Sequence, residues 1–287
     1  MRFALFGGSA PTWSPRELVS NLSSQGWDGV EWRVVDQKDA PEPGFWAGNR
    51  ATFPFTGIEG LIGEIAEVTD GGGMGFAGIA GYVQIGDHDA VDRLLAATAA
   101  LGAHQARVQL PKTGSPYRQL FAQARRDAEH AAERARHHGV KAVIQIHHGN
   151  IVSTSSAAVR LLEGLDSKHI GIIHDLGNTT IEGREGLTSY VPGLEILGDY
   201  LAHVHIKNAF WKPAQRRADG TIDWKWEWAP LREGMGDVPA YFRALKEVGY
   251  DAWVTVEDFT TVLPLEQRIA DDLAYLKACA REAGYPA

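Results

Sequence analysis

The sequence predicts an α/β fold, a (β/α)8 barrel, and three observations lead to it. Eight short apolar runs of β type alternate with amphipathic helical stretches. The 287 residues suit this barrel class, which takes about 250 residues. No linker rich in Pro, Gly or Ser divides the sequence, so we expect a single domain over residues 1–287. A doubly wound sheet with an added lobe is the structural alternative.

The eight expected strands are spread along the whole chain. They are RFALF (2–6), DGVEWR (28–33), GFAGIAGYV (75–83), QARVQL (105–110), KAVIQIH (141–147), HIGIIHD (169–175), AHVHIK (202–207) and AWVTVED (252–258). Residues 73–78 match the GxGxxG pattern of dinucleotide sites. In such a site the glycines follow a strand and begin a helix, whereas here they lead into the third strand, so we interpret them as a loop.

Capping residues mark the expected helices. Ser14-Pro15-Arg16-Glu17 has the form of a capping box with proline at the first helical position. Ser115-Pro116 begins a long helix that ends at Gly139. Asp237 can cap the helix VPAYFRALKEV, and a last helix spans about 265–283.

Composition narrows the classes of function. The net charge of −8 and the pI near 5.8 leave no basic face for nucleic acid. The single cysteine, Cys279, rules out a disulfide framework within the chain and a Cys-rich zinc site. No apolar run reaches the length of a membrane span, and the first apolar run is too short for a signal peptide. We therefore expect a soluble cytoplasmic protein without a membrane or nucleic-acid partner.

Polar residues gather at the ends of the expected strands. Alternate residues of a barrel strand face the interior, and active sites lie at the carboxyl ends of the strands. Strands five to eight place polar residues there with the same parity: Gln145, His147, Asp175, His205, Lys207 and Glu257. The second and fourth strands can add Glu31, Arg33, Arg107 and Gln109, which we expect to bind a substrate. The opposite parity of His148 and His174 predicts structural roles for them.

Four of these residues form a candidate metal site. A lone His205 is more often a hydrogen-bonded core histidine, and a lone Asp175 or Glu257 is often a cap or half of an ion pair. Their convergence from successive strands favours a site, because buried charges need a partner or a metal. Gln145, Asp175, His205 and Glu257 offer oxygen ligands and one imidazole, a set that suits Mn²⁺ first and Mg²⁺, Co²⁺ or Zn²⁺ as alternatives.

The ordered series of motifs resembles the xylose isomerase-like barrels, the sugar phosphate isomerase/epimerase superfamily. The resemblance is carried by GWDGVEW (26–32), VIQIHHGN (143–150), IIHDLGN (172–178), HVHIKN (203–208) and the segment LREGMGDVPAYFRALKEVGYDAWVTVEDF (231–259). It implies a TIM barrel whose metal ligands fall on Gln145, Asp175, His205 and Glu257. The metal would hold two oxygens of a hydroxy-ketone or cyclitol ketone, and a carbon beside the carbonyl would lose its proton. His147 and Lys207 would contact the substrate.

Three positions depart from the family pattern. Gln145 stands where the family has glutamate, Asn178 where histidine is frequent, and Asn208 where aspartate follows the lysine. Glutamine can offer an oxygen to a metal but cannot accept a proton as a base. Glu257, His147 or Lys207 must then supply the second catalytic proton-transfer group, unless the reaction needs only one. With two carboxylates among the metal ligands in place of three, we expect the protein to hold the metal less strongly. The bound metal should then be a stronger Lewis acid.

A long loop at about 208–236 follows the seventh expected strand. Trp224, Trp226 and Trp228 alternate with charged residues, which is a strand pattern. We expect a partial lid in which Trp211 and Trp226 stack on a sugar or aglycone ring, and an oligomer interface is the alternative. We expect Phe45 and Trp46, in the loop after the second strand, to complete the mouth of the site.

The leading hypothesis is a metal-dependent isomerase or epimerase that enolises a keto-sugar, a polyol-derived substrate or a cyclitol. A first alternative is a lyase, either a dehydratase or a deglycosidase that works by β-elimination on a 3-keto-sugar or glycoside. A second is a non-catalytic barrel that binds a sugar or a partner chain. DNA repair, as in the related AP endonucleases, is disfavoured by the net charge of −8 and by Asn178. A homo-oligomer or a small accessory subunit is compatible with each hypothesis.

Overall fold

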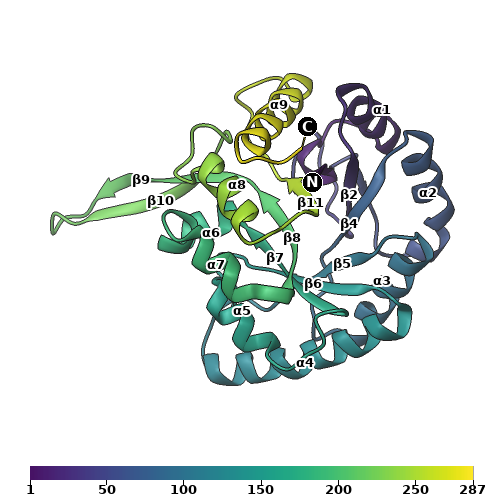
Figure 1. The fold of residues 1–287 in the computed structure, drawn as a ribbon, viewed down its shortest axis with the longest axis horizontal. Helices are drawn as coiled ribbons and strands as arrows, with labels where there is room; N and C mark the ends of the chain where they lie inside the picture. Colours follow the sequence, from purple (N-terminus) through teal and green to yellow (C-terminus); the bar gives the residue numbers. More distant parts are fainter. Residues whose placement is uncertain (287) are drawn as a thin grey trace.

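A computed structural model describes residues 1–286 and shows a closed barrel of eight parallel strands (Figure 1). The strands, in barrel order, are β1 (Arg2–Phe6), β11 (Trp253–Val256), β8 (Leu201–Ile206), β7 (Ile170–Asp175), β6 (Lys141–Gln145), β5 (Gln105–Val108), β4 (Gly75–Gly81) and β2 (Gly29–Val34). Pairing of β1 with β2 closes the barrel. The short β3 (Thr52–Phe53) adds to the edge of β2. The predicted barrel is therefore confirmed, and each expected strand has a counterpart.

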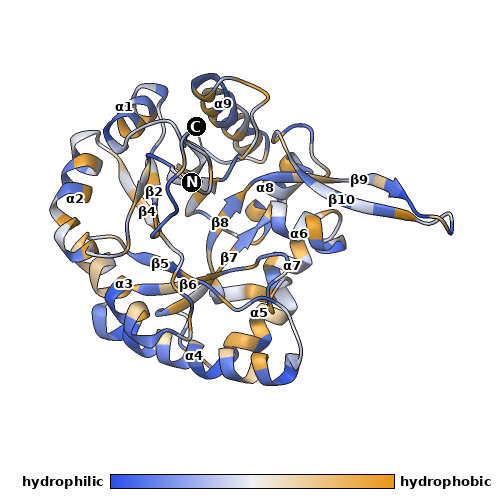
Figure 2. Ribbon diagram, turned by 180° about the vertical axis from the view of Figure 1, so that it is seen from behind, coloured by the Kyte–Doolittle hydropathy of each residue, from blue (hydrophilic) through white to orange (hydrophobic). Residues whose placement is uncertain are grey.

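Helices cover the outside of the barrel. They are α1 (Pro15–Gln25), α2 (Ile62–Gly71), α3 (His88–Ala100), α4 (Tyr117–His138), α5 (Ser155–Leu162), α6 (Leu176–Glu182), α7 (Tyr190–Leu197), α8 (Val238–Glu247) and α9 (Leu265–Glu282). The long α4 buries a row of alanines, whose small side chains allow close packing. Figure 2 shows hydrophilic residues along much of its outer surface. None of the described helices is both long and apolar enough to cross a membrane.

The expected helix signals are confirmed by hydrogen bonds. Ser14 N–H donates to Glu17 Oε2 at 2.7 Å, and Glu17 N–H donates to Ser14 Oγ, which completes the capping box. Asp237 Oδ1 accepts from the backbone N–H of Ala240 at 2.9 Å. Gly139, with φ 70°, ends α4 in the left-handed conformation that glycine adopts without strain.

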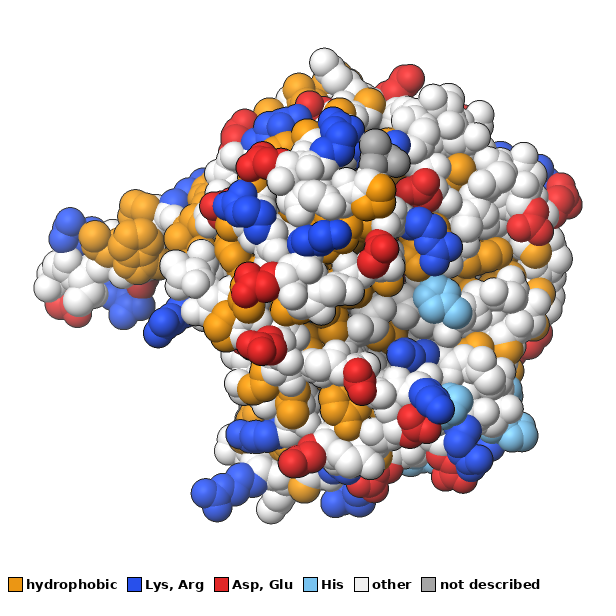
Figure 3. Space-filling view, viewed as in Figure 1, with side chains coloured by type: hydrophobic (Ala, Val, Ile, Leu, Met, Phe, Trp, Pro, Cys, Tyr) orange, Lys and Arg blue, Asp and Glu red, His pale blue; other side chains and the backbone are white. Residues whose placement is uncertain are grey.

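The long segment after β8 forms a β-hairpin. Strands β9 (Asn208–Arg216) and β10 (Ile222–Ala229) pair antiparallel, and Asp219 and Gly220 lie in the turn between them. Figures 1 and 3 show the hairpin as an arm that extends away from the barrel. Asn208, Ala209 and Ala229 at its base are buried, whereas its distal half is exposed. The strand that the alternating tryptophans predict is therefore confirmed. Because the distal half of the arm is exposed, only its base can serve as a lid.

Glycines allow the strands to approach one another beside a large side chain inside the barrel. Trp253 packs with Ala4 and Ala77 in a small apolar cluster. A Cβ at Gly29 would lie 2.4 Å from the carbonyl oxygen of Gly75 and 2.6 Å from the Trp253 ring. Backbone and indole therefore fill the space that a side chain at position 29 would need.

We predict that Gly29→Ala lowers the free energy of unfolding by roughly 1–3 kcal/mol, the usual cost of overpacking. Chemical denaturation followed by circular dichroism measures the change. The matched control is Gly63→Ala in α2, where an added Cβ meets nothing within 4 Å. Alanine there should leave stability unchanged or raise it by up to about 1 kcal/mol. Equal effects of the two substitutions would contradict this description of the barrel interior.

Candidate functional site

A cavity of about 290 Å³ lies at the carboxyl ends of the barrel strands. Strands β5 and β6 and two tryptophans of β10 line it. The remaining lining residues belong to the segments that follow β2, β4, β5, β6, β8 and β11. The lining residues are Trp46, Tyr82, Arg107, Gln109, Gln145, His147, His148, Lys207, Trp226, Trp228, Glu257 and Phe259. This is the end of the barrel at which enzymes of this fold place their active sites. Its polar groups converge from several strands, as the alternation of the strand residues predicts.

Three predicted metal ligands lie together beside this cavity. Asp175, His205 and Glu257 are buried, and one ligand atom of each lies within 4.8 Å of the others. His205 Nδ1 faces both carboxylates, 3.3 Å from Glu257 Oε1 and 3.9 Å from Asp175 Oδ2. Asp175 ends β7, His205 lies in β8 and Glu257 directly follows β11, so three neighbouring strands hold these groups in register.

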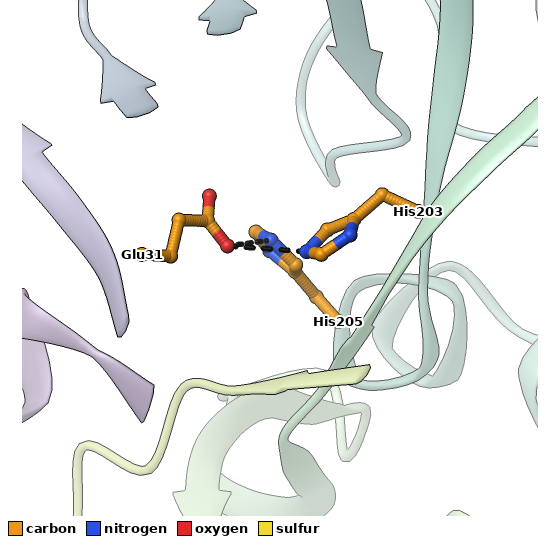
Figure 4. Close-up of side chains that lie close together, drawn as sticks. All are labelled: Glu31, His203 and His205. Carbon is orange, nitrogen blue, oxygen red and sulfur yellow. Dashed lines mark hydrogen bonds and ion pairs between the residues drawn. The ribbon is translucent and has the colours of Figure 1, made fainter. Parts of the chain in front are cut away.

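Glu31 fixes the far side of His205. Its Oε2 atom lies 2.8 Å from His205 Nε2 and 3.2 Å from His203 Nε2 (Figure 4). His203 Nε2 also lies 2.8 Å from Thr255 Oγ1. Burial lowers the pKa of His205, but the charges of Glu31 and Glu257 outweigh burial and raise this pKa to about 9. Glu31, expected to bind substrate, therefore orients His205 from behind and does not line the cavity.

Gln145 points its amide NH2 group, and not its oxygen, at the carboxylates. Arg107 Nη1 donates to Gln145 Oε1 at 2.9 Å, and Gln145 Nε2 donates to Asp175 Oδ2 at 2.5 Å. Guanidinium can only donate and carboxylate can only accept, so both contacts require this orientation. An amide nitrogen in this position is no metal ligand. Ligation by Gln145, as the sequence suggests, would require the amide to turn over and lose the bond to Arg107.

Lys207 lies between the two carboxylates. Its Nζ atom is 2.7 Å from Asp175 Oδ2 and forms an ion pair with Glu257 Oε2. Burial lowers the pKa of Lys207, but Asp175 and Glu257 more than compensate and raise it, so the amine stays charged. For Glu257, burial raises the pKa of the carboxyl. The positive charges of Lys207 and His205 outweigh burial, so the pKa of Glu257 lies well below its usual value. Lys207 is thus an internal cation for both acids.

The donor set fits a divalent ion. Two carboxylates and one imidazole can supply three ligands, and the carboxylate of Glu31 on the remote nitrogen of His205 is the usual orienting contact of a metal-bound histidine. An ion at His205 Nδ1 would have to displace the proton that the surrounding acids favour there. It would also have to displace Lys207 Nζ from Asp175. The site can hold a metal, and its own lysine competes with that metal.

Two histidines line the cavity after the end of β6. His147 Nδ1 lies 2.7 Å from the carbonyl oxygen of His148. Burial, reinforced by the charge of Lys207, lowers the pKa of His147 to about 4, so its ring is neutral at pH 7. Burial also lowers the pKa of His148, although a hydrogen bond to Asn178 opposes this. The structure brings His148 to the cavity, which the strand parity did not predict. The other off-parity histidine, His174, is fully buried beside Tyr241.

A turn explains the position of His148. The backbone N–H of Asn150 donates to the carbonyl oxygen of His147 at 3.1 Å, and Gly149 at the third position has φ 74°. Glycine is the residue that accepts this left-handed conformation readily. Strand alternation ends with β6 at Gln145, so parity no longer decides which way His148 points.

Aromatic side chains form the walls of the cavity. Trp46, Trp226 and two other predicted residues, Arg107 and Gln109, line it. Tyr82 and Phe259 also line the cavity, and no sequence pattern marks them. Trp228, one of the alternating tryptophans of the expected lid, lines the cavity too and contacts Trp226 and Phe259.

Two further predicted residues support the site from outside the cavity. Arg33 donates to Gln37, Thr52 and the carbonyl oxygen of Trp46, so it holds the loop that carries Trp46. Trp211 Nε1 donates to the carbonyl oxygen of Ile181 at 3.0 Å and thereby fixes the hairpin to α6.

Comparison with known proteins identifies relatives of this chain. A family model described as xylose isomerase-like TIM barrel matches residues 21–279. An inosose dehydratase of Lacticaseibacillus casei is 26% identical over 137 residues, which are 45% of this chain and 44% of that protein. The match thus spans less than half of that relative.

Solved structures agree in fold. The 3-keto-D-glucoside 4-epimerase of E. coli superposes with a TM-score of 0.70 at 19% identity, covering 97% of this chain and 100% of that one. A structure of IolI protein with a bound zinc atom gives 0.70 at 15% identity, covering 99% and 98%. At these identities the likeness shows the fold alone.

We predict that Lys207→Met binds Mn²⁺ roughly tenfold or more tightly than the unmodified protein, because each 1.4 kcal/mol of relieved competition is a factor of ten. Isothermal titration calorimetry measures the affinity without any substrate. Lys212→Met is the control, since Lys212 is half-exposed and pairs with Glu227 on the hairpin. Weaker Mn²⁺ binding by the Lys207 variant would show that the lysine does not compete with the ion.

Proposed function

The chain belongs to the xylose isomerase-like TIM barrel family, and on that basis we propose that it is an enzyme that enolises a keto-sugar or keto-cyclitol. The observation that carries the proposal is the convergence of buried cations and unprotonated imidazole on one small cavity. Enolisation removes a proton from a carbon beside a carbonyl and places negative charge on the carbonyl oxygen. The site therefore needs a base near carbon and cations near oxygen.

Arg107 is a donor for the developing oxyanion. Its side chain is buried, with 4% exposed, and its Nη2 atom has no hydrogen-bond partner among the described residues. A buried unpaired donor is costly, so a substrate oxygen that accepts from Nη2 would satisfy it. Lys207 lines the same cavity and adds a full positive charge. Cations held in place before the substrate arrives stabilise the enolate without further reorganisation.

His147 is the proposed base. Its Nδ1 atom faces a backbone carbonyl oxygen, which can only accept, so Nδ1 carries the ring proton and Nε2 the lone pair. Glu257 lines the cavity too, but Lys207 and Arg107 engage its carboxylate. Lys207 is charged and has no lone pair to offer. Of the three expected catalytic groups, His147 is thus the base, while Lys207 and Glu257 form the electrostatic frame.

A divalent metal would be held by Asp175, His205 and Glu257, and we propose Mn²⁺ for this oxygen-rich set, where it would polarise the substrate carbonyl as a Lewis acid. The chain's own residues do the remaining work. Asp175 keeps Gln145 and Lys207 in position through its Oδ2 atom. Gln145 cannot take a proton, so it positions Arg107 and Asp175 and does not act as a base.

The aromatic walls suit a ring-shaped carbohydrate. Sugar rings present C–H faces that pack on indole and phenyl groups, and Trp226, Trp228, Tyr82 and Phe259 surround the cavity. The names of the relatives also point to keto-carbohydrates: one is an inosose dehydratase and another a 3-keto-D-glucoside 4-epimerase. Both isomerase or epimerase and lyase chemistry begin with the same enolate. A non-catalytic sugar-binding barrel remains the alternative that the first experiment tests.

We predict that the Mn²⁺-loaded protein exchanges the proton beside the ketone of scyllo-inosose or of methyl 3-keto-β-D-glucopyranoside for deuterium in D2O. Proton NMR follows the loss of that signal, and this readout does not depend on the final product. His147→Gln should slow the exchange by about 100-fold or more, the usual contribution of a positioned base. His137→Gln on the outer helix α4 is the matched control and should leave it unchanged. Binding of both ketones without any exchange would favour the non-catalytic alternative.

We also predict that Trp226→Ala raises KM for the accepted ketone by roughly 5–30-fold, because one aromatic contact contributes about 1–2 kcal/mol. Trp224→Ala is the control: Trp224 is on the same strand but is 58% exposed and does not line the cavity. Steady-state kinetics of both variants compares them directly. Equal KM values for both variants would contradict the placement of substrate against the base of the hairpin.

A further inference from the structure

The distal arm, residues 212–225 of the β-hairpin, has little support from its own barrel. Every residue from 213 to 222 is exposed, and Figure 1 shows this part of β9 and β10 well away from the strands and helices of the barrel. A two-stranded hairpin alone is marginally stable in water and is stabilised by a further strand or by a packed face. The distal arm therefore needs another surface to pack against.

One face of the distal arm is apolar. Trp226 and Trp228 line the cavity, and Trp224 has the same parity on β10, so the aromatic face continues outward beyond the cavity. Trp224 is 58% exposed and lies opposite Pro213 of β9. Figure 3 shows hydrophobic side chains gathered on the arm. An exposed tryptophan on a projecting element is typical of a protein–protein contact, where this residue type is enriched.

The distal arm also carries a cation that has no acid as its partner. Three of the four cations of the hairpin form ion pairs within it: Lys212, Arg217 and Lys225. The fourth, Arg216, donates to the carbonyl oxygen of Gly220 and forms no ion pair in the described part of the chain. A surface that receives the arm should therefore be acidic. The chain itself is acidic, with a net charge of −8.

A hollow of about 310 Å³ on the barrel complements this arm. It lies between the ends of β2 and β4 and the start of α3. Its lining includes two aromatic rings and two exposed carboxylates that form no ion pair among residues 1–286: Phe55, Tyr82, Asp36 and Asp87. The hollow is large enough to admit an indole ring, and its rings and acids match Trp224 and Arg216 in chemistry.

The arm of one chain cannot reach the hollow of the same chain. The hairpin follows β8, and β8 and β4 are four positions apart in the ring of eight strands, so arm and hollow lie on opposite sides of the barrel (Figure 1). A second copy related by a two-fold axis presents both features in exchanged positions. The arm of each copy can then fill the hollow of the other, which closes the assembly as a dimer.

We propose that the chain forms a two-fold dimer in which each distal arm lies on the barrel of the partner. Trp224 packs between the partner's Phe55 and the partner's Tyr82, and Arg216 pairs with the partner's Asp36. Each contact occurs twice in the dimer, so a single substitution acts at two places. His147, Lys207 and Arg107 take no part in these contacts, so the inference is independent of the proposed enolisation.

Sedimentation velocity of the full chain over a concentration series measures the dissociation constant of the dimer. We expect the unmodified protein to sediment at micromolar concentration with twice the 31.3 kDa mass of one chain. Trp224→Glu should raise the Kd by about 100-fold or more, because aromatic anchors carry much of the binding energy of an interface. Ile196→Glu is the matched control: Ile196 is 47% exposed on α7 and lies outside both surfaces, so its replacement should leave the Kd unchanged.

A charge exchange tests which surface receives the arm. Arg216→Glu and Asp36→Lys should each raise the Kd by roughly tenfold or more, since each brings like charges together at both contacts. An equimolar mixture of these two variants should regain the Kd of the unmodified protein. In the mixed dimer one contact pairs the introduced glutamate with the introduced lysine, and the other keeps Arg216 with Asp36. Circular dichroism establishes that each variant is folded.

Three results would overturn the proposal. An unmodified protein that stays monomeric throughout the series would exclude a second copy as the occupant and leave the arm for a partner of another sequence. An unchanged Kd in Trp224→Glu would show that the chains associate without the arm. Folded charge variants that do not associate on mixing would show that the arm does not lie in this hollow.

Discussion

The placement of two carboxylates inside the barrel constrains everything around them. Asp175 and Glu257 are at most 2% exposed, and each contacts Lys207. Two buried acids this close are stable only with compensating positive charge, and breaking a buried pair by removing one partner is strongly destabilising. Lys207 and Arg107 supply that charge, while Glu31 holds His205 in a fixed orientation. The chemistry that we propose uses these same charges, so the same residues are needed for stability and for activity.

The glutamine at 145 has a clear role within this network. Its oxygen is held by Arg107 and its nitrogen by Asp175, so it connects a cation to an anion as a neutral spacer. A glutamate there would add one more acid beside the buried Asp175 and Glu257 and would repel Asp175. Because Gln145 cannot exchange protons, proton transfer must come from elsewhere, and the segment just after β6 offers two imidazoles. A residue that cannot act as a base at the end of the strand is thus followed, two and three residues later, by imidazoles that can.

The fold was predictable because strand and helix signals are local. Alternation within each strand also identified Gln145, Asp175, His205 and Glu257 as inward-facing, since parity holds while the backbone is extended. Strand parity did not predict that His148 faces the cavity, because the strand ends at Gln145 and a turn with Gly149 follows. The orientation of the Gln145 amide depends on Arg107 of another strand, so no local pattern could reveal it. The hairpin was visible as alternating tryptophans, but which of them reach the cavity depends on how the arm meets the barrel.

We propose that Asp175, His205 and Glu257 form a site for one divalent ion and that Lys207 competes with this ion for the two carboxylates. Equilibrium dialysis against Mn²⁺, followed by elemental mass spectrometry, tests it most directly. We expect about one equivalent of bound metal per chain in the unmodified protein and almost none in Asp175→Asn. Absence of stoichiometric binding, or unchanged binding in Asp175→Asn, would mean that the protein's own cations alone neutralise these carboxylates.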